Sequence, residues 1–254
     1  MVISLGELFH LVQLILLRTA VMLCVKKRTT SLGSSILVIA PHPDDEIFGA
    51  GGIIIAALEQ KQTVHILYLT DGEGNGVDPD PDRIHTERMK MSETVRVALG
   101  LPSEHLHRFH LSDGSVPRMG EGAFNQVAER LAILIDNMAP ETVFATHALD
   151  YWPYDHVACA ELAKAAVKRS QCKPTLYGYW VWAWYNLRPW QLFTYRHSDL
   201  QVADITPWFK AKQQLVDIYL NSTNEQGKPW SGVLPAALRR AFRFRVEVLE
   251  KIEI

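Results

Sequence analysis

The order of apolar and polar stretches after residue 35 predicts an α/β protein. Residues 36–40 and 142–146 are short, continuous apolar runs, as in strands of a parallel sheet that is buried on both faces. Longer stretches with helical periodicity separate such runs. This alternation predicts a Rossmann-like, doubly wound, mostly parallel sheet. We expect strands at 36–40, 64–69, 105–109, 142–146 and 175–182, and helices at 48–58, 85–99, 122–138 and 155–168.

The chain beyond residue 176 is less regular. Residues 177–197 are dense in aromatic side chains. Two interpretations are open: the rings form a wall that binds a sugar or a lipid, or the segment extends the sheet and packs its rings on the core. Two C-terminal helices are expected, at 206–219 and 235–251. The second would present a basic face of four arginines, diluted by glutamates: Arg239, Arg240, Arg243 and Arg245.

Residues 5–25 form an apolar stretch that is long enough to cross a bilayer. Its polar residues fall within one arc at helical spacing, so the predicted helix is amphipathic. An arginine near the centre disfavours a span, and the lack of early positive charge argues against a signal peptide. Three interpretations are open: a helix that lies on a membrane surface or packs on a partner, a true span, and a core helix. The interrupting residues are Glu7, His10, Gln13 and Arg18.

A basic triplet at 26–28 follows this helix. It suits an anionic headgroup layer, and the positive-inside rule then places the body in the cytoplasm, associated with the cytoplasmic face of a membrane. The alternative is an ordinary solvated helix end. Residues 29–35 look like a short linker. We therefore divide the chain into a helix and linker at 1–33 and a main domain at 34–254.

Composition narrows the class of protein. The 254 residues carry a net charge of −2, and nearly half of them are apolar, which excludes a disordered chain. No basic field favours nucleic acid as a partner. Three widely spaced cysteines form no disulfide framework, so a reducing compartment is expected.

The strongest chemical motif is PHPDDE at 41–46, directly after the first strand of the main domain. Ligands in such sheets bind at the carboxyl ends of strands. His42 and Asp45 are three residues apart on a proline-stiffened turn, and imidazole with carboxylate suits zinc or a similar divalent ion. Asp44 lies between them, where a carboxylate can take a proton from water. The alternative is that these acids only cap a helix.

A second motif follows the strand at 142–146. His156 begins the next helix and would supply a third metal ligand at the same edge of the sheet. Asp155 could fix the tautomer of an imidazole or the geometry of attack. Asp155 is also a natural N-cap residue, so this motif gains its weight from its placement beside the first.

The two motifs together resemble the PIG-L/LmbE family of zinc-dependent N-acetylglucosamine deacetylases. PHPDDE followed by GAGG at 49–52 carries most of the resemblance, and TDGEG at 70–74 supports it. The resemblance implies Zn²⁺ or another divalent metal as the cofactor and an amino-sugar or glycolipid substrate from which acetyl is removed. An oligomer is left open. Position by position, it implies His42, Asp45 and His156 as metal ligands and Asp44 and Asp155 as catalytic residues.

The residues expected to bind the substrate match the family's pattern less completely than the metal-binding motifs do. Arg88 resembles a substrate-side arginine of the family, and Asp71 lies in the TDGEG segment. The family's first histidine in D-x-H-P-D-H, which stabilises the oxyanion, is absent, because Trp152 or Pro153 stands there. Trp152 or Tyr154 could donate a hydrogen bond instead, and His147 is near in sequence. The alternatives are therefore hydrolysis of another amide or acyl group, or a catalytically weak sugar- or lipid-binding module.

Overall fold

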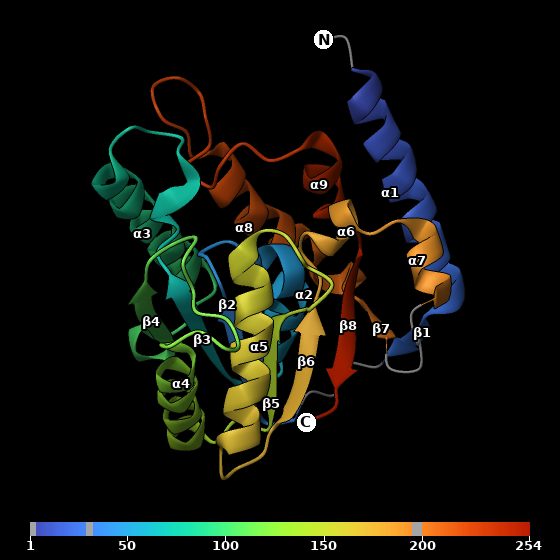
Figure 1. Ribbon diagram of the computed structural model, residues 1–254. Helices are drawn as coiled ribbons and strands as arrows, with labels where there is room; N and C mark the ends of the chain where they lie inside the picture. Colours follow the sequence, from blue (N-terminus) through green and yellow to red (C-terminus); the bar gives the residue numbers. More distant parts are fainter. Residues whose placement is uncertain (1–3, 29–32, 195–199) are drawn as a thin grey trace.

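The predicted strands assemble side by side into one sheet. This computed structural model describes residues 4–28, 33–194 and 200–254, and within them eight strands follow the order β1-β7-β8-β6-β5-β2-β3-β4 (Figure 1). β8 lies antiparallel between β6 and β7, and the other recorded pairings are parallel. The strands are β1 (Lys26–Arg28), β2 (Ser35–Ala40), β3 (Thr63–Thr70), β4 (Leu106–Leu111), β5 (Thr142–Thr146), β6 (Thr175–Tyr179), β7 (Leu200–Asp204) and β8 (Val246–Ile252).

Helices cover both faces of this sheet, which confirms the predicted α/β class. Ile36 and Val38 of β2 enter the core cluster on the face of α2 and α8, whereas Leu37 and Ile39 enter the cluster beneath α4 and α5. The continuous apolar run therefore serves two cores at once. The helices are α1 (Leu5–Cys24), α2 (Asp45–Glu59), α3 (Pro81–Ala98), α4 (Phe124–Met138), α5 (Tyr154–Arg169), α6 (Ala183–Asn186), α7 (Pro189–Thr194), α8 (Phe209–Asn221) and α9 (Ala236–Ala241).

The predicted helix at 235–251 is wrong. The chain forms the short helix α9, turns, and returns as β8. β8 pairs with strands on both sides, and Glu247 in it is buried against α8 by an ion pair to Lys212 at 2.6 Å. Local helix propensity is a weak preference, and insertion between two strands overrides it here.

The aromatic segment does not extend the sheet, since β6 ends at Tyr179 and α6 and α7 follow. Trp180 and Trp184 are nevertheless buried in the core, so the expected packing of rings is confirmed for them. Trp182 is also buried, and Trp190 is exposed. Residues 195–197 of this segment lie outside the described residues.

The glycines of GAGG allow the close approach of α2 to its neighbours. A Cβ on Gly49 would lie 2.2 Å from the ring of Tyr179, and one on Gly52 would lie 2.5 Å from Ile205. Both distances are far below van der Waals contact, so larger residues would push α2 off the sheet. This packing places the first turn of α2 directly above the carboxyl end of β2.

The N-terminal helix packs on the domain by one stripe. Leu14, Leu17 and Val21 are buried in the main core, and Gln13 donates hydrogen bonds to the carbonyls of Tyr185 (3.1 Å) and Leu187 (2.9 Å). The basic triplet then continues as β1, paired with β7 at the edge of the sheet. Most of the predicted linker, residues 29–32, lies outside the described residues.

Candidate active site

The turn 41–46 joins the carboxyl end of β2 to the start of α2. Asp44 has a φ angle of 133°, a value that residues with a side chain rarely adopt. Its carboxylate makes no capping hydrogen bond to α2, and its amide instead donates to Glu46 Oε2 at 2.8 Å. The interpretation of Asp44 as a simple helix cap is therefore wrong. Backbone strain of this kind concentrates at functional sites.

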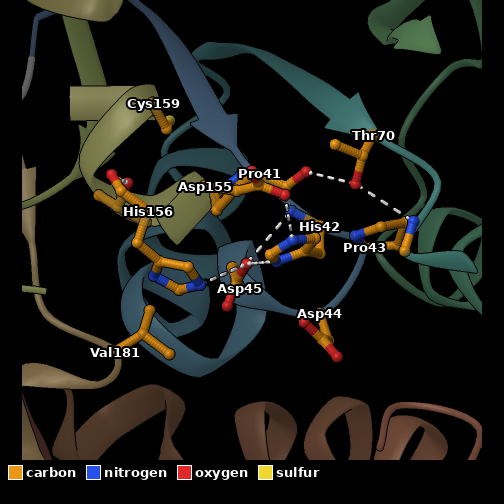
Figure 2. Close-up of polar contacts among 12 residues, drawn as sticks. Pro41, His42, Pro43, Asp44, Asp45, Thr70, Asp155, His156, Cys159 and Val181 are labelled. Atoms are coloured by element: carbon orange, nitrogen blue, oxygen red, sulfur yellow. Dashed lines mark hydrogen bonds and ion pairs between the residues drawn. The ribbon is translucent and has the colours of Figure 1, made fainter. Parts of the chain in front are cut away.

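His42, Asp45 and His156 converge as the sequence predicts (Figure 2). His42 Nδ1 lies 3.1 Å from Asp45 Oδ2, and His156 Nε2 lies 3.3 Å from the same oxygen. One ligand atom from each residue lies within 4.8 Å of the others. The first two residues come from the turn after β2, and the third comes from the first turn of α5, after β5.

These three residues fit a divalent metal ion. His156 Nε2 is buried, and among the described residues its contact with Asp45 Oδ2 at 3.3 Å is an ion pair without hydrogen-bond geometry, so this nitrogen is placed to bind a metal ion in place of a proton. Burial opposes charge on this imidazole, but Asp45 and Asp150 raise the pKa of His156 to about 9. The site therefore attracts positive charge. Two imidazoles and one carboxylate also form a ligand set that zinc accepts.

Asp150 holds His156 in place. Its Oδ2 lies 3.1 Å from His156 Nδ1, and it accepts hydrogen bonds from the backbone amides of Val181 and Trp182 at 3.0 and 3.1 Å. A carboxylate behind a ligating histidine fixes the ring orientation and the tautomer. The sequence interpretation assigned Asp150 no role. Its place as the first acid of the run that ends in Asp155-His156 was the available signal.

Asp155 contacts the other histidine. Its Oδ2 lies 3.2 Å from His42 Nε2, and the amides of Gly114 and Val116 donate to its carboxylate. Asp113, which the sequence interpretation missed, reaches the same nitrogen at 3.1 Å. Burial opposes the imidazolium, but hydrogen bonds to these two acids raise the pKa of His42 well above its usual value. Asp113 lies in the loop after β4, so only the order of strands in the sheet reveals that it is close to His42.

Asp44 and Arg88 form a buried ion pair beside His42, Asp45 and His156. Arg88 lies 3.2 Å from Asp44 Oδ2 and also donates to the carbonyl of Pro43 at 2.6 Å. Burial raises the pKa of Asp44 to about 8, although the charge of Arg88 opposes this shift. A Cβ on Gly72 would lie 2.2 Å from Arg88 Nε, so the TDGEG segment makes room for the guanidinium group.

A cavity of about 350 Å³ opens over these residues. Its lining combines the polar groups of the site with the rings of Phe48, Trp182 and Phe242. Trp152 lies at the rim, 56% exposed, with its ring edge-on to Trp182 at 4.7 Å. Tyr154 also lines the cavity, and its hydroxyl donates to Glu121 at 2.7 Å. A cavity of this size accommodates a small ligand.

Two other candidates lie apart from this cavity lining. Asp71 is buried, and its carboxylate contacts Arg108 at 3.2 Å and His110 at 2.6 Å. It therefore stabilises the loop wall through these contacts. His147 is buried and bonded to Glu250 on β8, and it lines a different depression. This placement does not support His147 as a replacement for the family's oxyanion histidine.

Solved structures share this fold. The hydratase GalB of Pseudomonas putida KT2440, which acts on 4-carboxy-2-hydroxymuconate, is 17% identical, covers 87% of this chain and 97% of its own, and has a TM-score of 0.63. The N,N'-diacetylchitobiose deacetylase of Pyrococcus horikoshii is 20% identical over 89% and 82%, with a TM-score of 0.61. The deacetylase of teicoplanin biosynthesis is 16% identical over 85% and 97%, with a TM-score of 0.57. At these identities the likeness establishes the fold alone.

The family follows from the sequence itself. The PIG-L family, described as GlcNAc-PI de-N-acetylase, matches residues 37–167, which include both motifs of the site. This match spans more than half of the chain, and the chain therefore belongs to the PIG-L family. A comparison with curated protein sequences finds no match.

Proposed function

We propose that this protein is a zinc-dependent N-deacetylase that removes the acetyl group from an N-acetylated amino-sugar conjugate. The observation that carries this proposal is the convergence of His42, Asp45 and His156 beside Asp44 at the floor of one cavity. Membership of the PIG-L family supports the same reaction. A bound zinc ion would supply Lewis acidity toward water and toward the amide carbonyl.

The protein's own residues then move the proton. Asp44 accepts a proton from the water that attacks the carbonyl carbon, and it returns that proton to the amine nitrogen as the carbon–nitrogen bond breaks. Acetate and a free amine are the products. A base acts best when its pKa lies near the working pH, and burial brings the pKa of Asp44 toward that range. Arg88 holds this carboxylate in position through the contact at 3.2 Å.

The remaining residues orient the ligands and the substrate. Asp150 holds the imidazole of His156, and Asp155 holds that of His42. As a result, His156 Nε2 and His42 Nδ1 both face Asp45. Trp152 and Tyr154 at the rim are proposed to contact the sugar, and each carries a polar tip that can donate a hydrogen bond. Asp71 is proposed to act on the substrate only indirectly, by fixing the loop next to Arg88.

A weakly catalytic sugar-binding module is the second candidate. The absence of a histidine at the position of Trp152 or Pro153 favours it, since loss of one oxyanion donor costs about 10²–10³ in rate. A further alternative is hydrolysis of a different amide or acyl group by the same residues. Both alternatives use the same cavity, so activity assays must separate them.

The decisive experiment combines metal analysis with product detection. The full chain is incubated with N-acetylglucosamine conjugates, both water-soluble and lipid-linked, and acetate and free amine are quantified. We expect equal amounts of the two products and one zinc ion per chain, and a His42→Ala variant that loses both zinc and activity. Undiminished zinc in His42→Ala would contradict the ligand assignment. Sugar binding that survives chelation, without acetate release, would favour the binding module.

The setting of the enzyme is also proposed. We propose a glycolipid substrate, a cytoplasmic location and contact of the N-terminal helix with a membrane. The support is the apolar, amphipathic character of residues 5–25 and the basic triplet that follows. A net charge of −2 gives no support to nucleic acid as a partner.

A further inference from the structure

One face of α1 is apolar and uncovered. Its large side chains are exposed at helical spacing along the whole helix, with Leu5 87% and Leu23 80% exposed at the two ends. Such a continuous exposed stripe is unusual for a surface helix, which normally presents polar residues to water. The stripe consists of Leu5, Leu8, Phe9, Val12, Ile15, Leu16, Met22 and Leu23.

The opposite face of α1 is committed to the protein. Leu14, Leu17 and Val21 are buried. Gln13 donates hydrogen bonds to two backbone carbonyls, that of Tyr185 in α6 and that of Leu187 just after it. By length and composition Leu5–Leu23 could cross a membrane, but a helix that keeps these contacts cannot also be surrounded by lipid. The geometry fits a helix that lies in the plane of a surface.

An arginine cluster flanks the apolar stripe. A surface depression between α1 and α9 is lined by Arg18, Arg239, Arg240, Arg243 and Arg245. Among the described residues, the one carboxylate recorded in contact with this cluster is Asp217, 3.5 Å from Arg243. All five guanidinium groups belong to exposed residues, so their charge is available to a partner.

The arginine cluster and the apolar stripe are continuous. A second depression is lined by Arg18 and Arg240 together with Ile15, Met22 and Leu23 of the stripe. Arg18 is held at this boundary by stacking over Phe244, with its guanidinium carbon 4.8 Å from the ring centroid. An apolar band beside a dense row of cations complements the acyl boundary and the phosphates of a lipid leaflet.

We propose that α1 and this arginine cluster form a docking surface for an anionic lipid bilayer, with α1 lying in the membrane plane rather than crossing it. A second copy of the chain is the less favourable occupant. A symmetric dimer places the same patch on both sides of the contact and would bring two arginine clusters together. The phosphate layer of a bilayer instead neutralises them.

The docking surface is connected to the catalytic cavity. Tyr185 of α6 stacks on His10 of α1, with ring centroids 4.3 Å apart, and is nearly perpendicular to the ring of Trp182, with centroids 6.1 Å apart. Trp182 lines the cavity. If the proposed deacetylase function holds, docking brings the cavity wall close to the leaflet, where a lipid-linked substrate would be presented.

Vesicle flotation of the full chain tests the docking surface without relying on catalysis. We expect recovery with vesicles of phosphatidylcholine and phosphatidylserine, weaker recovery with phosphatidylcholine alone, and partial release by salt, since salt screens exposed charges. Arg239→Gln/Arg240→Gln should weaken binding about 25-fold, because each basic residue near an anionic surface contributes about fivefold. The matched control is Lys164→Gln/Lys168→Gln on α5, which should bind as the wild type does.

A second pair of variants tests the apolar stripe. Ile15→Ser/Leu16→Ser should weaken binding about tenfold or more, through lost apolar burial. Val97→Ser/Ile133→Ser replaces equally exposed residues on α3 and α4 and should have no effect. Thermal melting confirms that each variant is folded.

Three outcomes would overturn the proposal. The first is equal recovery of the arginine variants and the wild type with anionic vesicles. The second is a wild-type dimer in light scattering that Ile15→Ser/Leu16→Ser converts to a monomer, without vesicle binding. The third is membrane-bound protein that resists both salt and alkaline extraction, as a spanning helix does. None of these outcomes bears on acetate release, so the catalytic proposal is judged separately.

Discussion

Two clusters of buried charge lie along α2, and they differ in what their charges contact. The site cluster consists of His42, Asp44 and Asp45 at the start of α2, together with Asp155 and His156 from the first turn of α5. The support pair consists of Lys212 and Glu247, 2.6 Å apart, behind the middle of the helix. Both are almost fully buried, apart from His42, whose side chain is 13% exposed.

The support pair is saturated by the protein. Glu247 accepts hydrogen bonds from the amides of Gly52 and Ile53, and Lys212 also donates to the carbonyl of Phe48 at 3.0 Å. The site cluster instead lines a cavity, and His156 Nε2 has no hydrogen-bond partner among the described residues. Burial of charge alone therefore does not mark a catalytic site. We propose the site cluster as catalytic because its buried charges also line a cavity.

The largest expected effect is on catalysis, in the site cluster. Asp44→Asn should lower acetate release by about 10²–10⁴, because the amide cannot accept the proton of water. Zinc content should stay near wild type, since Asp44 is assigned as a base and not as a ligand, whereas the melting temperature should fall, because Arg88 loses its buried counter-charge. Asp82→Asn, an exposed acid on α3, is the control. Turnover within a few-fold of wild type in Asp44→Asn would disprove the assigned role.

The next effect is on stability, in the support pair. Lys212→Met should lower the free energy of unfolding by about 3–5 kcal/mol, because it leaves Glu247 buried without a counter-charge. Chemical denaturation measures this loss, and Lys210→Met on the same helix is the exposed control. The double variant Lys212→Met/Glu247→Gln should recover part of the loss. A single variant as stable as wild type would show that the pair is not needed.

A smaller effect is expected at Asp150, behind the proposed metal ligand His156. Asp150→Asn should weaken zinc affinity by about 10–100-fold, because the amide holds the His156 ring less firmly in the required tautomer. Competition with a chelator measures the affinity, and Asp217→Asn serves as the surface control. An unchanged affinity together with a large loss of stability would make Asp150 a purely structural residue.

The smallest effect concerns a half-buried group outside both clusters. Burial, with the charges of His105 and His107, lowers the pKa of His65 to about 4. The unfolded chain therefore binds a proton below about pH 6.5 that the folded chain refuses, so stability falls as pH drops from about 6.5 toward 4. Solvent screening limits the effect to about 1 kcal/mol. His65→Gln should flatten this part of the stability profile, and an unchanged profile would contradict the assignment.

Strands β2 to β6 were predictable because their signals are local, whereas β1 at Lys26–Arg28 was not expected to be a strand. The apolar run of β2, the helical period of α2 and the motif at 41–46 all lie within one short stretch. Parallel strands place their carboxyl ends at one edge, so the meeting of His42, Asp45 and His156 follows from strand order and motif position.

The C-terminal part was less predictable because its partners are distant. Residues 246–252 could satisfy their backbone hydrogen bonds in a helix or in a strand. Their position between β6 and β7, where they pair with both neighbours, selects the strand. The contact of Asp113 with His42 depends in the same way on the neighbouring loop after β4. Asp113 lies three residues after His110, and the sequence around it contains no motif that would have identified it as a site residue.

The sequence by itself determined the α/β class, the PHPDDE motif at 41–46 and the amphipathic character of α1, since each depends on residue type and on spacing within short segments. Only the tertiary structure decided that Asp155 supports His42 rather than His156, and that Lys212 and Glu247 serve α2. It also decided that the arginines of α9 lie beside the apolar stripe. These facts depend on side chains far apart in the chain, whose proximity is set by packing and not by local preference.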